Sequence, residues 1–460
     1  MTTAPRVSIV SLGCSRNDVD SEELAGRLAA DGWDLVANGE DAEMVLVNTC
    51  GFIESAKKDS IDTLLEASDV MAGQGKVVAV GCLAQRYGKE LAAQLPEADA
   101  ILGFDHYENI GSTLRRVLDG EAIESHTPAD RRTLLPISPV DRVQVKDEIV
   151  VPGMGPHIYR SRLNASPWAP LKIASGCDRR CTFCAIPAFR GSFVSRNPLE
   201  IIEEAVWLGA NGVSEILLVS ENSTSYGKDL GDLRSLERLL PALTMIDGIE
   251  WVRVSYLQPA EMRPELVQII ANTPGVVPYF DLSFQHASAT VLRRMKRFGG
   301  TEPFLELLAT ARAANPLLGA RTNVIAGFPG ETEQDVEELA QFIIESKLDA
   351  VGVFGYSDED GTAAVKLDGH LPQHEVETRR EYLATVAERA CEEVALNRIG
   401  QFVTVLIEED DNVGRSAHQG PEVDGSTSIV GNELYAIGTF VQAKVVDTEG
   451  IDLIAQVVNP

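Results

Sequence analysis

The sequence lacks long apolar runs and has few cysteines and few positive charges, and each of these features excludes some classes of protein. No apolar run approaches the ~18 residues that a membrane-spanning helix needs, which excludes a helical membrane protein. Only 7 cysteines occur among 460 residues, an odd number and too few for a disulfide framework. Positive charge is scarce, because 40 Lys and Arg stand against 69 Asp and Glu. We therefore expect a cytoplasmic protein with reduced thiols and no general affinity for nucleic acid.

The net charge of −29 has two interpretations. An acidic, solvated surface keeps a protein soluble, and the same surface attracts a basic protein partner. Composition alone leaves both open. The length predicts two to four domains with ample core, and 44% of the residues are hydrophobic.

Three of the cysteines form a compact motif in the middle of the chain. Cys177, Cys181 and Cys184 follow the apolar run 171–174 with the spacing Cys-x-x-x-Cys-x-x-Cys. Structural zinc normally has four protein ligands, and no further Cys or His follows closely enough to be the fourth. Three thiolates suit an iron–sulfur cube whose fourth iron lacks a protein ligand. An open iron can bind and cleave a small molecule, so the motif indicates chemistry beyond electron storage.

The N-terminal 115 residues alternate apolar runs with amphipathic stretches. Val7–Val10, Met44–Val47 and Val77–Val80 are expected as buried strands, and Asp20–Asp31 and Ser55–Ala67 as helices. The first helix is expected to open on Ser21, with Glu22 and Glu23 close behind. This alternation is typical of βα units around a parallel sheet.

Each of these three strands is followed at once by a cysteine. Cys14, Cys50 and Cys82 are far apart in sequence, but the carboxyl ends of parallel strands meet at one edge of a sheet. Cysteines kept only for packing would stand inside the strands rather than just beyond them. The positions therefore predict a second metal site.

After a non-periodic linker at 121–165, the βα alternation resumes from about 168 to 395 and favours a partial (β/α) barrel. Arg160 and Arg162, in the linker, are expected to be ordinary solvated arginines, with steering of a substrate as the alternative. Thr332 and Asp335 approximate a helix capping box. His286 and Cys391 are expected to be buried structural residues. The predicted elements are the helix Leu199–Leu208 and the strands Glu215–Val219, Trp251–Val254, Phe280–Phe284, Arg321–Ala326 and Val351–Phe354.

The last stretch, about 398–460, is rich in short β runs separated by Gly, Asp and Asn. Phe402–Ile407, Leu434–Ile437 and Phe440–Val446 predict a small antiparallel β-barrel. The overall prediction is an α/β protein with four segments: a parallel-sheet domain (5–120), a linker (121–165), a partial (β/α) barrel domain (166–396) and the small barrel (397–460).

The cysteine motifs resemble those of a known family. The segment 177–184, with Phe183 before the last cysteine, resembles the signature of radical S-adenosylmethionine (SAM) enzymes. The segments 13–17, 48–52 and 80–86 resemble the three cysteine motifs of the methylthiotransferase N-terminal domain, and 414–425 resembles the TRAM domain. The resemblance implies two [4Fe–4S] clusters: one whose open iron chelates SAM, and an auxiliary cluster to which exogenous sulfur attaches.

The resemblance also implies where SAM is held. Glu221 and Asn222 stand where relatives more often have Gln-Asp, near the methionine amino group. Ser283 and Gln285 match a strand facing the ribose and substrate, and Gly327 lies in a turn that backs the adenine. Arg190 and Arg196 are candidates for the SAM carboxylate or a substrate acid. The implied cofactor-binding set is Phe183, Glu221, Asn222, Ser283, Gln285, Gly327 and Arg196, with no catalytic residue assigned beyond the cluster ligands.

Within this family the pattern is most similar to members that methylthiolate the β-carbon of an aspartate in ribosomal protein S-twelve of the small subunit. One SAM would methylate the sulfur and a second would supply the radical, while the electron and sulfur donors are not specified. The alternative is a MiaB-type enzyme acting on an isopentenylated adenosine beside the anticodon of tRNA. A third possibility, an iron–sulfur scaffold without radical chemistry, would release no 5′-deoxyadenosine. The segment 398–460 holds three cations and ten acids, which favours the basic ribosomal protein over tRNA.

Overall fold

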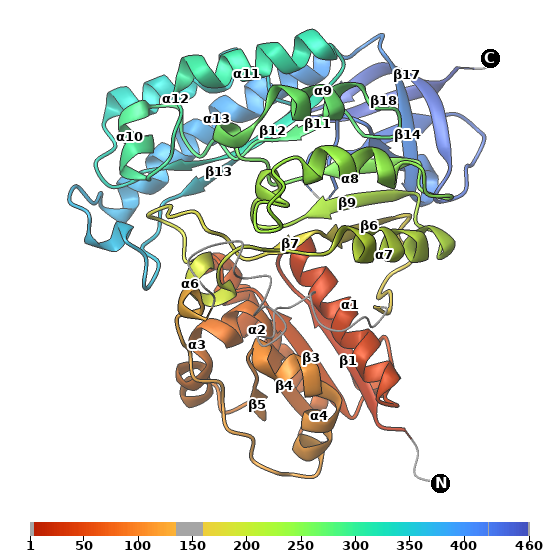
Figure 1. The fold of residues 1–460 in the computed structure, drawn as a ribbon, viewed down its shortest axis with the longest axis vertical. Helices are drawn as coiled ribbons and strands as arrows, with labels where there is room; N and C mark the ends of the chain where they lie inside the picture. The colour runs from red at the N-terminus through yellow and green to blue at the C-terminus, as the bar shows by residue number, and fades with distance from the viewer. Residues whose placement is uncertain (1–3, 135–159, 422, 459–460) are drawn as a thin grey trace.

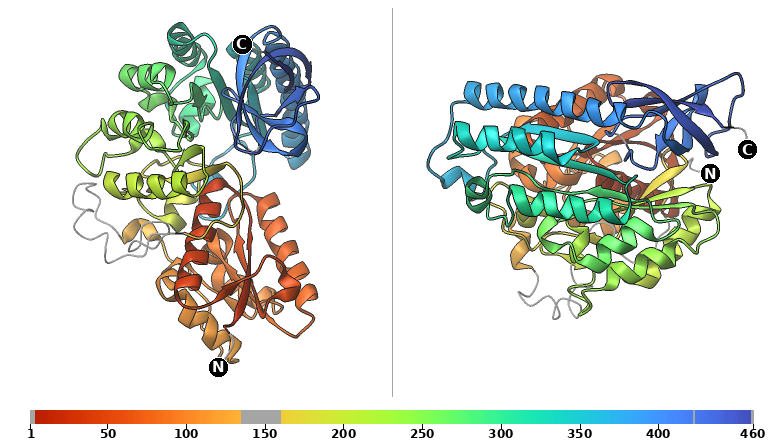
Figure 2. Two further views of the ribbon diagram at one scale, coloured as in Figure 1. Left: turned by 90° about the vertical axis from the view of Figure 1, so that its right-hand side faces the viewer. Right: turned by 90° about the horizontal axis from the view of Figure 1, so that it is seen from above.

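The computed structural model describes residues 4–134, 160–421 and 423–458. A five-stranded sheet takes up the N-terminal part, two three-stranded sheets take up the middle, and a closed barrel ends the chain (Figure 1). The N-terminal sheet lies at one end of the molecule, and the closed barrel packs beside the middle part (Figure 2). The predicted fold class is confirmed. Most of the predicted linker, 135–159, lies outside the described residues, and the domain boundaries stay predictions.

The N-terminal sheet has the order β2-β1-β3-β4-β5, with parallel pairings throughout. Strand β3 is buried along its whole length because helices cover both faces of the sheet. Leu46 packs with α1 and α4, whereas Val45 and Val47 pack with α2 and α3. The three predicted strands are confirmed. The elements are β1 (Arg6–Ser11), α1 (Ser15–Ala30), β2 (Asp34–Leu35), β3 (Met44–Thr49), α2 (Glu54–Met71), β4 (Lys76–Val80), α3 (Gly81–Gln94), β5 (Ala100–Ile101) and α4 (Ile110–Leu118).

Helix α1 begins earlier than predicted. It starts at Ser15, directly after Cys14, so the expected opening at Ser21 was wrong. Ser21 is buried inside the helix, where its hydroxyl accepts a hydrogen bond from the Asn48 side chain and donates one to Ser11. A tertiary hydrogen-bond network, and not a cap, explains this serine.

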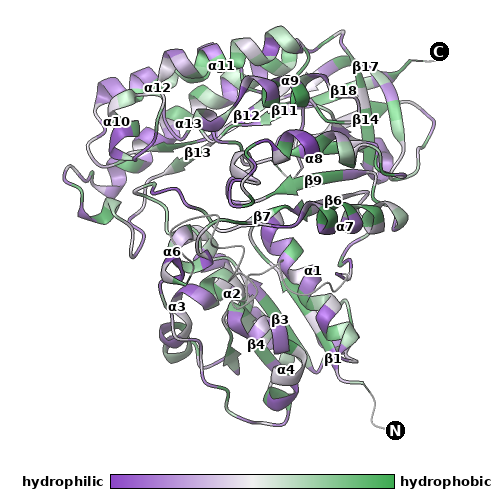
Figure 3. Ribbon diagram, viewed as in Figure 1, coloured by the Kyte–Doolittle hydropathy of each residue, from purple (hydrophilic) through white to green (hydrophobic). Residues whose placement is uncertain are grey.

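Six parallel strands follow one another in chain order through the middle part, as expected for a partial barrel. Isolated parallel bridges, Val252 to Val276 and Leu257 to Leu282, join the sheet β6-β9-β10 to the sheet β11-β12-β13. Figure 3 shows that the strands are mostly hydrophobic, whereas the helices carry both hydrophobic and hydrophilic residues. The strands are β6 (Trp168–Lys172), β9 (Glu215–Val219), β10 (Trp251–Val254), β11 (Tyr279–Asp281), β12 (Gly319–Ala326) and β13 (Ala350–Gly355). The other elements are β7 (Ala174–Ser175), α6 (Ile186–Arg190), β8 (Val194–Ser195), α7 (Pro198–Ala210), α8 (Ser235–Leu243), α9 (Pro264–Asn272), α10 (Ala289–Arg294), α11 (Thr301–Ala314), α12 (Glu333–Ser346) and α13 (Gln373–Leu396).

Two details of the middle part bear on the predictions. The Thr332–Asp335 capping box is present at the start of α12, as predicted. The strand expected at Phe280–Phe284 is β11, which ends at Asp281. Gln285 has a φ of +71°, a backbone conformation that interrupts a regular strand. His286 and Cys391 are buried, as predicted.

The C-terminal barrel closes in the order β14-β15-β16-β18-β17. Its pairings are antiparallel except that of β16 with β18, which is parallel. The strand predicted at Leu434–Ile437 is absent and that prediction was wrong, since this segment is a loop with Leu434 75% exposed. The strands are β14 (Phe402–Glu409), β15 (Val413–Ser416), β16 (Thr427–Val430), β17 (Phe440–Glu449) and β18 (Asp452–Val457).

Buried ion pairs connect the N-terminal sheet domain to the middle part. Arg160 lies 3.3 Å from Glu22 of α1 and 3.2 Å from Glu204 of α7, and only 3% of its side chain is exposed. Arg162 lies 3.4 Å from Glu22. The expectation that both arginines are solvated was wrong, because a buried guanidinium requires the carboxylates that these distant segments supply. None of the described helices is both long and apolar enough to cross a membrane.

Candidate active site

Cys14, Cys50 and Cys82 meet at the carboxyl edge of the N-terminal sheet. Cys50 directly follows β3, and Cys14 lies just beyond the end of β1. Cys82 lies in the first turn of α3, which follows β4. Gly13, with φ +102°, lets the strands approach: a Cβ there would lie 2.8 Å from the Cys50 Cβ and 2.9 Å from its sulfur. The predicted convergence of these thiols is therefore present.

The electrostatics of this first site differ from thiol to thiol, because burial raises the pKa of Cys50 and Cys82 whereas the pKa of Cys14 is lowered. Burial, together with Cys82 and Cys14, raises the pKa of Cys50 to about 11. Burial also opposes ionisation of Cys14, but Arg16 and Arg190 outweigh it and hold the pKa of that thiol below its usual value. Thiolates that lie close together repel one another, and Arg16 and Arg190 reduce that repulsion. The arrangement is therefore compatible with three thiolates that bind one positively charged group.

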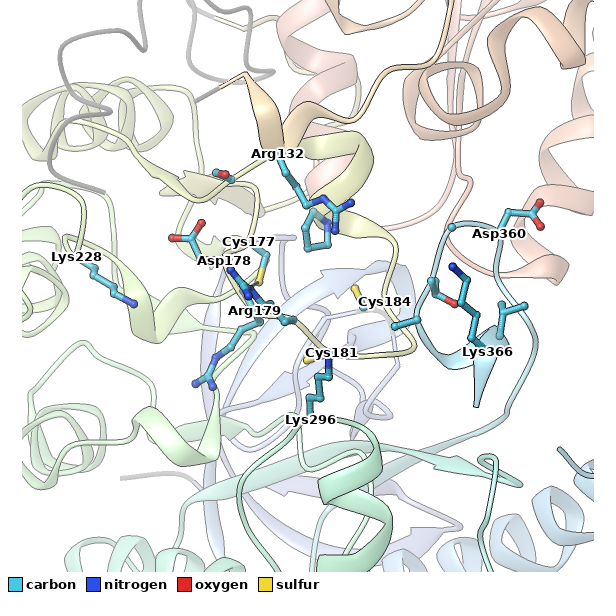
Figure 4. A pocket seen from close by; sticks show the side chains of 17 residues that line it. Arg132, Cys177, Asp178, Arg179, Cys181, Cys184, Lys228, Lys296, Asp360 and Lys366 are labelled. Carbon is cyan, nitrogen blue, oxygen red and sulfur yellow. Dashed lines mark hydrogen bonds between the residues drawn. The ribbon is translucent and has the colours of Figure 1, made fainter. Parts of the chain in front are cut away.

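The second set of cysteines lines a cavity of about 860 Å³ (Figure 4). Cys177, Cys181 and Cys184 lie on the loop between β7 and α6, and their sulfurs gather at the centre of the view. Burial, and then Cys181, raises the pKa of Cys184 to about 12. Gly176 precedes the motif because a Cβ there would lie 2.2 Å from the Ser192 carbonyl oxygen. Among the described residues, no three His, Cys, Asp or Glu side chains are grouped to hold a single ion. Cysteines spread around a cube, each on a different iron, need no such group.

The two cysteine sites are adjacent. Arg16, on the first turn of α1, acts electrostatically on Cys14 of one site and on Cys184 of the other. Its guanidinium lies over the Tyr256 ring, 4.6 Å from the centroid, and 3.8 Å from Glu221. Arg190, the last residue of α6, contacts both Cys82 and Glu221. Sequence reasoning considered Arg190 only as a partner of SAM or a substrate acid, and Arg16 only as part of a motif.

A loop of the middle part also ties the two sites together. Glu359 lies 2.8 Å from Lys57 and 2.8 Å from Arg86 of the N-terminal sheet domain. Arg86 also donates to the Gly51 carbonyl, next to Cys50, and to the Asp360 carbonyl. The same loop, through Asp360 and Lys366, lines the cavity beside Cys184. The contact therefore anchors a loop that lines one side of the cavity.

The predicted SAM-binding residues differ in how they are engaged. Glu221, only 1% exposed, has both carboxylate oxygens without a hydrogen-bond partner among the described residues. Asn222 donates to Ser225 and to Glu261, and Glu261 lies 2.6 Å from Arg179 of the cysteine loop. Sequence reasoning missed Glu261, because a lone acid after a strand gives no pattern. The roles of Glu221 and Asn222 stay predictions.

The remaining predicted residues lie around the same sheets. The Gln285 amide donates to the Asn323 carbonyl, which continues the pairing with β12. The Ser283 carbonyl accepts a hydrogen bond from Arg297. Gly327 lacks a Cβ because one would lie 2.8 Å from Val376 of α13, so packing alone requires this glycine.

Phe183 and Arg196 complete the predicted set. The Phe183 ring meets Phe328 edge-on, with 6.5 Å between centroids. Arg196 donates to the Lys172 carbonyl and lies 2.7 Å from Glu204, so structural partners already hold its guanidinium. The proposed contacts of both residues with SAM stay predictions.

Comparison with known proteins agrees with this arrangement. Three family models match: "Uncharacterized protein family UPF0004" at residues 6–103, "Radical SAM superfamily" at 171–343 and "TRAM domain" at 399–458. A solved structure of the radical SAM methyltransferase TsrM from Kitasatospora setae shares the fold, with a TM-score of 0.55 at 12% identity over 79% of this chain and 77% of that chain.

Curated relatives cover nearly the whole chain. A protein of Nocardioides sp. is 58% identical over 98% of this chain and 96% of its own length. A protein of Kineococcus radiotolerans is 57% identical over 99% of this chain and 97% of its own length. Both are named "Ribosomal protein uS12 methylthiotransferase RimO". With its two cysteine sites, its partial barrel and its TRAM barrel, the chain belongs to the RimO family of radical SAM methylthiotransferases.

Proposed function

We propose that the enzyme methylthiolates the β-carbon of an aspartate in ribosomal protein uS12 (protein S-twelve of the small subunit). The observation that carries this proposal is the adjacency of two three-cysteine sites, with Arg16 and Arg190 between them. The proposed cofactors are two [4Fe–4S] clusters, one on Cys14, Cys50 and Cys82 and one on Cys177, Cys181 and Cys184, with SAM as co-substrate. When bound, they supply the electron and radical chemistry that an unactivated carbon requires and a place for the transferred sulfur.

The residues around the second cysteine site are arranged to hold and orient SAM. Glu221 is a buried carboxylate that lies near Arg16 and Arg190, but its oxygens have no hydrogen-bond partner among the described residues, so it can accept hydrogen bonds from the methionine ammonium. Glu261 contacts both Asn222 and Arg179. It thereby connects the cysteine loop to the segment that follows β9. The loop that carries Glu359 and Asp360 limits access of water from the side of the N-terminal sheet domain.

The charge of the TRAM barrel supports a basic protein substrate. Of its cations, Arg398 and Arg415 are buried in pairs with Asp349 and with Glu215 and Glu408. Lys444 is exposed, as are six acids of the barrel. These acids are Glu409, Asp410, Asp411, Glu433, Asp447 and Glu449. Such a surface repels phosphate and attracts a strongly basic protein such as uS12. The burial of two of the three cations makes the barrel more acidic than its sequence alone implies.

The alternative, MiaB-type action on tRNA, is not favoured. The named relatives are uS12 enzymes, and the barrel offers few cations for a nucleic-acid backbone. We place the reaction in the cytoplasm, where thiols stay reduced and ribosomal proteins are available. The substrate is uS12, free or on the small subunit, and separate electron and sulfur donors are required.

An anaerobic competition tests the proposed substrate. Reconstituted enzyme, SAM, reductant and sulfide would be incubated with uS12 and isopentenylated tRNA together, and both substrates would be analysed by mass spectrometry. We expect one methylthio group on an aspartate of uS12 and none on the tRNA. Methylthiolation of the tRNA nucleoside alone would overturn the substrate assignment.

A further inference from the structure

Arg190 connects the segment that follows the second set of cysteines to a cysteine of the first set. It ends α6, the helix that follows the Cys177–Cys184 motif, yet its Nη2 lies 3.2 Å from the sulfur of Cys82 in the N-terminal sheet domain. Only 3% of its side chain is exposed. A residue of the SAM-binding part therefore donates a hydrogen bond to a proposed ligand of the other cluster.

Protein groups fix the position of this guanidinium. The same Nη2 donates to Asn17 Oδ1 at 2.9 Å and to Asp20 Oδ2 at 3.0 Å. Asp20 is itself paired with the buried Lys172 of β6. The Phe104 ring lies beneath, 5.4 Å from the guanidinium carbon. The donor to the sulfur is thus held by partners from the N-terminal sheet domain, one of which is itself paired with β6.

The Nε of Arg190 lies near Glu221, a residue that we propose binds SAM. The distance from this Nε to Glu221 Oε1 is 3.5 Å, a contact of charges rather than a hydrogen bond. Arg190 Nη1 and both Glu221 oxygens have no hydrogen-bond partner among the described residues. Glu221 therefore partly offsets the positive charge that Arg190 presents to Cys82.

We infer that Arg190 is a positioning residue that sets the reduction potential of the auxiliary cluster, with Glu221 acting in the opposite sense. The inference rests on the proposed function, because it takes Cys82 as a ligand of that cluster. Hydrogen bonds to the ligand sulfurs and the net charge nearby tune iron–sulfur potentials. A cation beside the sulfur stabilises the reduced, more negative cluster and raises its potential. A carboxylate near that cation lowers the potential.

The test measures the potential itself, without substrate. In a full-length background with Cys177, Cys181 and Cys184 replaced by Ala, the auxiliary cluster would be reconstituted and titrated by electron paramagnetic resonance. We expect Arg190→Gln to lower the midpoint potential and Arg190→Lys to lower it less, because Lys keeps the charge. Glu221→Gln should raise the potential. Arg160→Gln is the matched control, since Arg160 is equally buried and pairs acids from the same two parts.

The outcomes separate the possibilities. An unchanged potential in Arg190→Gln at full iron content, or an equal shift in Arg160→Gln, would overturn the inference. Loss of auxiliary iron from Arg190→Gln, with retention in Arg190→Lys and Arg160→Gln, would overturn it, because Arg190 would then be required to retain the cluster rather than to set its potential. A parent protein that forms no cluster would overturn the proposed function and the inference together. A parent with the expected shifts that does not modify uS12 would overturn the substrate assignment only.

Discussion

At the scale of single residues, the two cysteine sites should be separable by substitution. Cys181→Ala removes a proposed ligand of the SAM-cleaving cluster and should abolish both 5′-deoxyadenosine formation and the methylthio product. Cys50→Ala removes a proposed ligand of the auxiliary cluster, so 5′-deoxyadenosine should still form while sulfur insertion is lost. Both products can be quantified by mass spectrometry in single anaerobic reactions.

The seventh cysteine provides the control for this pair. Cys391 is 4% exposed on α13, and burial raises its pKa to about 12, as expected of an inert core thiol. Cys391→Ala should retain both products. A Cys50→Ala enzyme that still inserts sulfur would contradict the assignment of two sites with different roles.

The residues that sequence reasoning found and missed differ in how their positions are determined. Cys14, Cys50 and Cys82 could be grouped because strand ends converge in any parallel sheet. Glu261 could not be placed beside Arg179 of the cysteine loop, nor Arg190 at Cys82, because their contacts depend on how separate elements pack. Arg160 was misjudged for the same reason, since its partners Glu22 and Glu204 come from two different helices.

At the scale of elements, the capping box of α12 offers a local test. The Thr332 hydroxyl accepts a hydrogen bond from the Asp335 amide, and the Asp335 carboxylate accepts one from the Thr332 amide. Thr332→Ala should lower the free energy of unfolding by about 1 kcal/mol, read as a lower melting temperature. Thr310→Ala, on the exposed face of α11, is the control, and the cap is unimportant if both variants melt alike.

Predictions of elements succeeded where the pattern was strong. Buried runs such as Met44–Val47 have little alternative to a central strand, and the βα alternation led directly to the partial barrel. Leu434–Ile437 has the composition of a strand, but it lacks a pairing partner and remains an exposed loop. Strand β15 was missed because it is only four residues long and contains Gly414, a poor strand former. A Cβ at residue 414 would lie 1.9 Å from the Leu406 carbonyl oxygen, so the glycine is required by close pairing with β14.

At the scale of the whole molecule, a buried ion cluster joins the TRAM barrel to the partial barrel. Glu215 of β9 accepts hydrogen bonds from Arg253 of β10 and, at 2.7 Å, from Arg415 of β15. Burial alone would raise the pKa of Glu215, but Arg253 and Arg415 outweigh it and hold the pKa below its usual value of about 4.3. The stabilisation is therefore present above that pH and is lost as the pH falls through the lowered pKa.

The contribution of Glu215 to stability is therefore expected to depend on pH. Glu215→Gln leaves two buried arginines without this carboxylate and should cost about 3 kcal/mol at pH 7. The difference in melting temperature between the two proteins should shrink below about pH 4, because Glu215 of the unfolded chain takes up a proton there while the folded enzyme, with its lowered pKa, still resists protonation. Thermal unfolding between pH 7 and pH 3 measures it. A constant difference across this range would show that charge at Glu215 does not stabilise the interface.

The acidic barrel should determine how the enzyme meets uS12. Glu409→Gln, Asp410→Asn and Asp411→Asn together remove three charges at the end of β14 with little change in shape, and Asn tolerates the φ of +62° at residue 411. We expect weaker binding of uS12, a smaller dependence of affinity on salt, and unchanged 5′-deoxyadenosine formation. The matched control neutralises exposed Asp59, Glu66 and Asp69 on α2, which changes net charge equally at the opposite part of the molecule. If both triple variants weaken binding alike, long-range net charge attracts uS12; if only the barrel variant does, the barrel is the docking surface.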